Sequence, residues 1–241
     1  MKNLKSIVQY ECFTSFKYIW LFYAIQYAIV GFITLIVGLA SGTFDDIGSK
    51  CLETNTLIYI SILGVMGFKE DFKMLIQNGF SRKYIFIATL SMFAFISGIM
   101  ALIDTITGTL LHYFSSSYFS MYGALYGYRH SFINWLWLFL LYMIFCCLMY
   151  FVILLINKIG RTASVCLAAA SGGIILLVIA LFRYVLSAET VSSILEFLAA
   201  AMGFTAGGAV NRIIPLLTLS VLAAVFAAGA YAIIRRTELK E

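Results

Sequence analysis

The stretch "GFKEDFKMLIQNGFSRKYIFI", residues 67–87, places four basic and two acidic side chains between two runs that are almost purely apolar. Its own apolar residues recur at i, i+4, i+7 and i+8, which puts them on one face of a helix. They are Phe68, Phe72, Leu75 and Ile76. The spacing predicts a short amphipathic helix over 68–78.

Two further features predict where that helix ends and where the next one begins. Asn78-Gly79 is typical of a helix C-terminus, because glycine adopts the left-handed conformation at little cost. Ser81 is suited to the N-cap of the following helix. The simplest interpretation is a surface helix that rests on lipid headgroups, with its lysines reaching toward phosphates.

The composition of the whole chain indicates an integral membrane protein. Of the 241 residues, 63% are hydrophobic and only 11% are charged, whereas a soluble domain has about 25% charged residues. The mean hydropathy is +0.99. A chain with so few charges could not cover its apolar surface in water, so we exclude a soluble globular domain.

Uncharged runs mark the membrane spans, since about 20 apolar residues are needed to cross roughly 30 Å of hydrocarbon. The run between Arg129 and Lys158 has 28 residues, whereas the run from Thr54 to Phe68 has only 15. We expect an all-α protein with a single transmembrane domain, residues 1–241, and six spans. These are 19–41, 54–68, 85–111, 132–156, 163–184 and 212–234.

The distribution of Lys and Arg predicts the orientation, because cytoplasmic segments carry the excess of these residues. With the N-terminus inside, only four of the sixteen Lys and Arg residues lie outside. Both termini are therefore expected inside. The net charge of +5 then reflects topology, and no nucleic-acid partner is expected. The four outside are Lys50, Arg129, Arg183 and Arg212.

Two segments outside the spans are also amphipathic. Residues 1–18 predict an interfacial helix in which Glu11 falls near the middle of the apolar face. Glu11 is expected either to turn toward water or to pair with a basic residue such as Arg82, because an unpaired buried carboxylate is unfavourable. The segment "AETVSSILEFL", residues 188–198, predicts a short helix on the outer surface.

Asp104 is the only acidic residue inside a predicted span, and an intramembrane carboxylate is a functional candidate by default. Counted from Ile85 at 1.5 Å per residue, it lies roughly 28 Å along the third span, near the outer membrane edge. Two interpretations stay open, a structural role at the interface and a place on the cargo path. The aromatic loop 112–132 that follows is expected to form an interface belt, and its two histidines alone predict no metal site.

The stretch "EDFKMLIQNGFSRKYIF" resembles the cytoplasmic loop after the second span of type-2 ATP-binding-cassette (ABC) permeases, in particular the small bacterial permeases of peptide or lantibiotic export and immunity. The six-span layout is similar as well. The resemblance implies that 68–78 is a coupling helix that docks on a separate ATPase subunit, and that 185–211 forms partly re-entrant outside helices. The residues that carry the match are Glu70, Phe72, Leu75, Asn78, Gly79, Ser81 and Arg82, with Ile76 on the same apolar face and Glu11 near the ATPase side.

The functional expectation is therefore the permease subunit of an ABC exporter in a bacterial plasma membrane, with an amphipathic or hydrophobic cargo such as a peptide. The sequence contains no G-x-x-x-x-G-K-[ST] phosphate loop, so ATP and Mg²⁺ would be bound by the partner ATPase and no cofactor by this chain. A second permease chain, identical or paralogous, would complete the transporter.

Two alternatives belong to other classes of protein. One is a membrane substrate-binding subunit of an uptake transporter, which can also have six spans. The other is an intramembrane enzyme, which would need a Ser/His pair, paired carboxylates or an H-E-x-x-H zinc site within the spans. No such motif lies in the predicted spans, so we do not expect an enzyme.

Overall fold

The computed structural model describes residues 2–42, 50–66, 73–77, 79–115, 117–205 and 210–235. It is 86% helical, which confirms the all-α expectation. Within the described residues no β-strand forms, and the one extended pairing is an isolated bridge between Phe204 and Val210. In the described part of the chain, five helices are long and apolar enough to cross a membrane, which is compatible with a multi-pass membrane protein.

Helix α1, Lys2–Ser41, is a single helix of 40 residues. The sequence predicts an interfacial helix, 1–18, followed by a span, 19–41. The structure has no break between residues 18 and 19. At 1.5 Å per residue it is about 60 Å long, roughly twice the hydrocarbon thickness. The part that qualifies as a span is Ser15–Ser41.

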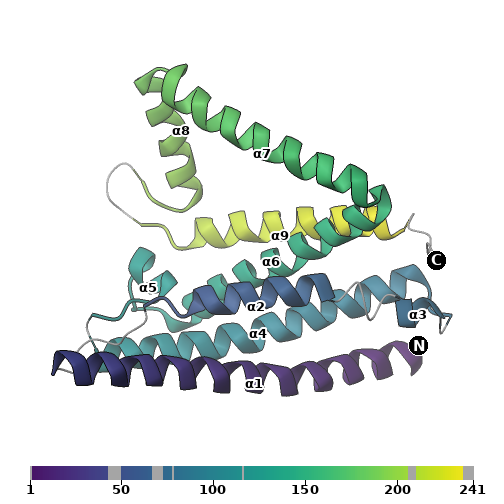
Figure 1. Cartoon of the computed structure of the whole chain (residues 1–241), viewed down its shortest axis with the longest axis horizontal. Helices are drawn as coiled ribbons and strands as arrows, with labels where there is room; N and C mark the ends of the chain where they lie inside the picture. Colours follow the sequence, from purple (N-terminus) through teal and green to yellow (C-terminus); the bar gives the residue numbers. More distant parts are fainter. Residues whose placement is uncertain are drawn as a thin grey trace.

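Four of the five long helices lie side by side with α2 (Figure 1). Helix α6 is at the centre of this bundle and packs against α2, α4 and α9, while α1 packs on α4. Helices α4, α6, α7 and α9 begin and end within three residues of the predicted spans. The bounds are α2 Glu53–Met66, α4 Arg82–Phe114, α6 Ser131–Ile159, α7 Arg161–Tyr184 and α9 Ile213–Ile234.

Helix α2 is where the prediction of spans differs most from the structure. It has 14 residues, about 21 Å at 1.5 Å per residue, so it is shorter than the hydrocarbon layer and is not among the five candidate spans. It packs closely on α6 at Gly64, where a Cβ atom would lie 2.8 Å from the carbonyl oxygen of Cys146. Only glycine allows the two backbones to approach this closely.

The remaining helices are short or lie apart from the bundle. Helix α3, Lys73–Gln77, lies at the end of the bundle where α1 begins, and α5, Met121–Tyr126, lies at the opposite end (Figure 1). Helix α7 leaves the bundle at an angle and α8, Ala188–Ala201, returns toward α9 (Figure 1). Among the described side chains of the α7 span none is buried, so the apolar residues of this arm are not covered by the bundle.

Candidate functional site

The turn after α3 is closed by the hydrogen bonds of a Schellman motif. The Phe80 N–H donates to the Leu75 carbonyl at 3.1 Å, and the Gly79 N–H donates to the Ile76 carbonyl at 2.9 Å. Gly79 has φ +78°, the left-handed conformation that this motif requires. The predicted helix stop is confirmed at Gly79, while Asn78 lies outside the described residues.

The apolar side of α3 faces the bundle. Leu75 is 2% exposed and belongs to the same buried apolar cluster as Ile85 and Ile234. Ile76 and Phe80 are partly buried and pack against this cluster. These three side chains are therefore anchored to the helix bundle, and Leu75 in particular is not available to a partner protein.

The opposite side of the turn is open to the surroundings. Gln77, Gly79, Ser81 and Lys83 are exposed, and a Cβ atom added to Gly79 would meet nothing within 4 Å. The exposed surface of the turn is thus polar, with a lysine at its edge. We call these four residues the turn surface.

Ser81 and Arg82 start α4. Ser81 occupies the N-cap position, as predicted, but its side chain makes no capping hydrogen bond. The Arg82 guanidinium donates to the carbonyl oxygen of Arg235 at 3.0 Å, so the structure directs it to the end of α9. The side chain of Glu11 lies outside the described residues, as do Glu70 and Phe72, and their predicted roles stay predictions.

Asp104 is the centre of a second polar cluster, inside the bundle. Its carboxylate accepts hydrogen bonds from the hydroxyl of Tyr23 at 2.9 Å and from that of Tyr142 at 2.5 Å. The side chain is 4% exposed. These bonds join α1, α4 and α6 through one carboxylate, and they satisfy both of its oxygens. The geometry favours the structural interpretation of Asp104.

Glu53 is a buried acidic residue that sequence analysis did not single out. It is the first residue of α2, is 1% exposed, and accepts a hydrogen bond from the Met121 N–H at 3.3 Å. It lies one position before the apolar run that begins at Thr54, so the run assigns it to the preceding loop. The signal in the sequence is that this run has only 15 residues, too few to cross the membrane, so that its first residues can lie inside the bundle.

The loop 112–132 is packed more tightly than an interface belt would be. Tyr118, Tyr122 and Tyr126 are each no more than 5% exposed, whereas Tyr113, Phe114 and Phe132 are exposed. Burial and the neighbouring Glu53 carboxylate raise the pKa of Tyr118 above its usual value. Half of the loop therefore covers the end of the bundle beside Glu53.

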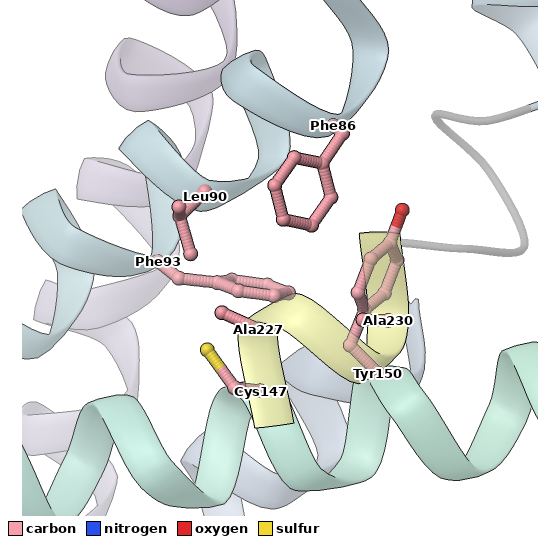
Figure 2. A pocket seen from close by; sticks show the side chains of 7 residues that line it. All are labelled: Phe86, Leu90, Phe93, Cys147, Tyr150, Ala227 and Ala230. Carbon is pink, nitrogen blue, oxygen red and sulfur yellow. The ribbon is translucent and has the colours of Figure 1, made fainter. Parts of the chain in front are cut away.

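Among the described residues, an open hollow of about 410 Å³ lies between α1 and α4. Its lining is mostly apolar, and its Tyr27 and Thr107 hydroxyls hydrogen-bond each other at 2.9 Å. A second, between α4, α6 and α9, has no room for a water molecule (Figure 2). Residues lining the first include Val30, Gly31, Leu35, Leu52 and Leu111.

The described residues contain no group of three or more His, Cys, Asp or Glu side chains that could hold a metal ion. Two sites on α4 have a defined geometry. The turn surface, anchored by Leu75, lies at the N-terminal end of α4, and the Asp104 carboxylate lies toward its C-terminal end. No protein-family model, curated protein or solved structure matches the chain.

Proposed function

We propose that this chain is the permease subunit of an ABC exporter in a bacterial plasma membrane, and that the turn surface is where a separate ATPase subunit binds. In this proposal α2 is the second of six spans, both termini are cytoplasmic, and a second permease chain completes the transporter. The observation that carries the proposal is the geometry of α3 and the turn after it. Their apolar side packs against the bundle, and their polar side is exposed.

Three considerations support this. Residues 70–82 resemble the coupling loop of type-2 ABC permeases. Because Leu75 is anchored in the buried cluster, a push on the exposed side of α3 would be passed to the bundle instead of moving a loose loop. The N- and C-terminal helices α1 and α9 begin and end near α3 (Figure 1), on the side that the distribution of Lys and Arg makes cytoplasmic.

The cargo is proposed to be amphipathic or hydrophobic. The hollow between α1 and α4 offers a mostly apolar lining whose Tyr27 and Thr107 hydroxyls are already paired with each other. Such a surface suits an apolar chain better than a polar solute, because unpaired polar groups of the cargo would lose their hydration there.

The test compares two glycines with the same backbone conformation. Gly79 and Gly42 have φ +78° and +72°, and a Cβ atom would meet open space at both. Valine in this conformation costs about 1–2 kcal/mol at either position. Tagged native chain, Gly79→Val and Gly42→Val would be captured from bacterial membranes in mild detergent, and ATPase activity would be measured in the eluate.

We expect activity with the native chain and with Gly42→Val, and a roughly tenfold loss with Gly79→Val, since each 1.4 kcal/mol is tenfold in binding. Equal loss with both variants would show a general destabilisation and contradict the role of the turn. No ATPase with the native chain would contradict the exporter proposal as a whole.

A further inference from the structure

The beginning of α4 and the end of α9 are joined by a charged hydrogen bond. The Arg82 guanidinium donates to the carbonyl oxygen of Arg235 at 3.0 Å. Arg235 is the C-cap residue of α9, and the last carbonyls of a helix have no partner within the helix. A cation at this position is also favoured by the negative end of the helix dipole. Arg82 thus caps a helix other than its own.

A second contact lies one helical turn further along both helices. The rings of Phe86 and Tyr231 have their centroids 5.1 Å apart. Phe86 follows Arg82 by four residues and Tyr231 precedes Arg235 by four, so each pair lies on one helix face. The antiparallel helices α4 and α9 therefore meet at two successive turns beside the turn surface.

A small gap between α4, α6 and α9 lies next to the ring contact. Figure 2 shows the side chains around it, which are Phe86, Leu90 and Phe93 of α4, Cys147 and Tyr150 of α6, and Ala227 and Ala230 of α9. The gap is too small for water, so the atoms that line it lack contact partners on one side. The side chains from α9 are alanines, which reach little way across. Arg82 and Phe86 thus reach α9 at its C-terminal end, and Phe86 also borders the gap.

We propose that Arg82 is a positioning residue that fixes α9 to the turn surface, so that a displacement of the turn is carried to the C-terminal end of α9. This rests on the proposed coupling function, and it changes the role of Arg82 from an ATPase contact to a link within the permease. The turn is held on its other side by Leu75. Turn, start of α4 and end of α9 then move as one body.

The experiment measures the distance between the start of α4, beside the turn, and α9 directly. Tyr84 and Ala232 are both exposed and lie outside the turn surface, so spin labels would be attached to cysteines at these two positions, in a chain whose five native cysteines are replaced. The distance distribution would be recorded by pulsed electron resonance for the native chain captured with its ATPase, before and after trapping with ATP, Mg²⁺ and vanadate.

With Arg82 present we expect one narrow distribution whose centre does not shift on trapping. With Arg82→Gln we expect a broader distribution that does shift, while the amount of captured ATPase stays the same. Arg82→Lys should restore the narrow distribution, because lysine is long enough to bring a charged donor to the same carbonyl, whereas the glutamine amide is shorter and neutral. Lys158→Gln, which removes an exposed cation from the end of α6, should have no effect.

Each contrary result has a distinct meaning. A distribution that Arg82→Gln leaves unchanged, or that shifts on trapping in the native chain, overturns the link. Loss of ATPase capture in Arg82→Gln shows that Arg82 binds the partner, which overturns the inference and leaves the proposed function standing. If the native chain captures no ATPase, the proposed function fails, and the comparison of native chain and Arg82→Gln without nucleotide still decides whether the link exists.

Discussion

The two ends of α4 lie in different settings. Toward its C-terminal end, Asp104 is buried and accepts hydrogen bonds from Tyr23 of α1 and Tyr142 of α6, so three helices share one carboxylate. At its N-terminal end, Arg82 makes a single hydrogen bond to the last carbonyl of α9, and a gap follows where α4, α6 and α9 face one another (Figure 2).

The difference indicates that the Asp104 end of α4 is held more firmly than the Arg82 end. The Asp104 carboxylate is buried and held by two hydroxyl donors. Moving α1 or α6 away from α4 would leave the carboxylate and a tyrosine hydroxyl unpaired inside the bundle, which is unfavourable. The other end relies on one partly exposed hydrogen bond, one ring contact and the anchor of Leu75. Motion that begins at the turn surface would therefore be largest at that end and smallest near Asp104.

The largest expected effect comes from removing the Asp104 carboxylate. Asp104→Ala deletes two hydrogen bonds to a charged group and leaves the Tyr142 hydroxyl without this partner. The loss should lower the free energy of unfolding by about 3 kcal/mol, measured as a lower midpoint of thermal unfolding in detergent. Glu196→Ala, which removes an exposed carboxylate from α8, is the control. Equal midpoints for the two variants would mean that the cluster does not fix this end.

A smaller, local effect is expected at the other end of α4. Leu75→Ala removes a side chain that is 2% exposed. The cost should be about 2 kcal/mol, the lower end of the range for a buried leucine, because the short α3 can settle into the space that is left. Because α3 is short, we expect the turn to open locally while the bundle stays folded. Hydrogen exchange of the Gly79 and Phe80 amides should become roughly 30-fold faster or more, since 1.4 kcal/mol is a factor of ten.

The matched control for this experiment is Gln77→Ala, which changes an exposed residue of the same helix. It should leave exchange at the turn nearly unchanged. If Leu75→Ala instead lowers the unfolding midpoint of the whole protein as much as Asp104→Ala does, the two ends are equally fixed and the contrast between them is wrong.

The smallest expected effect concerns the loop beside the fixed end. Burial raises the pKa of the Cys51 thiol, and the neighbouring Glu53 carboxylate raises it further. Glu53→Gln removes the negative charge, so the pKa of Cys51 should fall and more thiolate should form at pH 8. Maleimide labelling of Cys51, with the other four cysteines replaced, should speed up by less than about tenfold, the effect of one pKa unit.

Glu189→Gln removes an exposed carboxylate on α8 and should leave the labelling rate of Cys51 as it is. Slower labelling in Glu53→Gln would show that the amide closes the loop over Cys51. The carboxylate would then not be the group that sets the reactivity of the thiol, and the packing at this end would be different from that described.

Much of the fold follows from local sequence. The long uncharged runs predict α4, α6, α7 and α9 to within three residues, because a helix must satisfy its own backbone in an apolar medium. Gly79 predicts its turn, since the left-handed conformation favours glycine. The expected boundary at residue 18 has no counterpart in α1, because a change in amphipathic pattern does not by itself interrupt backbone hydrogen bonding.

The sites were less predictable, because which way a side chain faces depends on neighbours far along the chain. The pattern places Leu75 on an apolar face but cannot say whether that face meets a partner or the bundle. Arg82 is close to Arg235 in space and 153 residues away in sequence. Asp104 could be found as a lone charge in a span, but Tyr23 and Tyr142 are ordinary tyrosines until the helices are packed.

Local sequence is enough to predict an all-helical chain with several membrane-length apolar helices and a glycine-closed turn before α4, because hydropathy and backbone preference act within a few residues. The packing of the helices settles the rest: Leu75 faces inward, Arg82 reaches the end of α9, Glu53 is buried, and α7 contacts little of the bundle. Those outcomes depend on which helix faces pack together, and packing is a property of residues that the chain brings together from far apart.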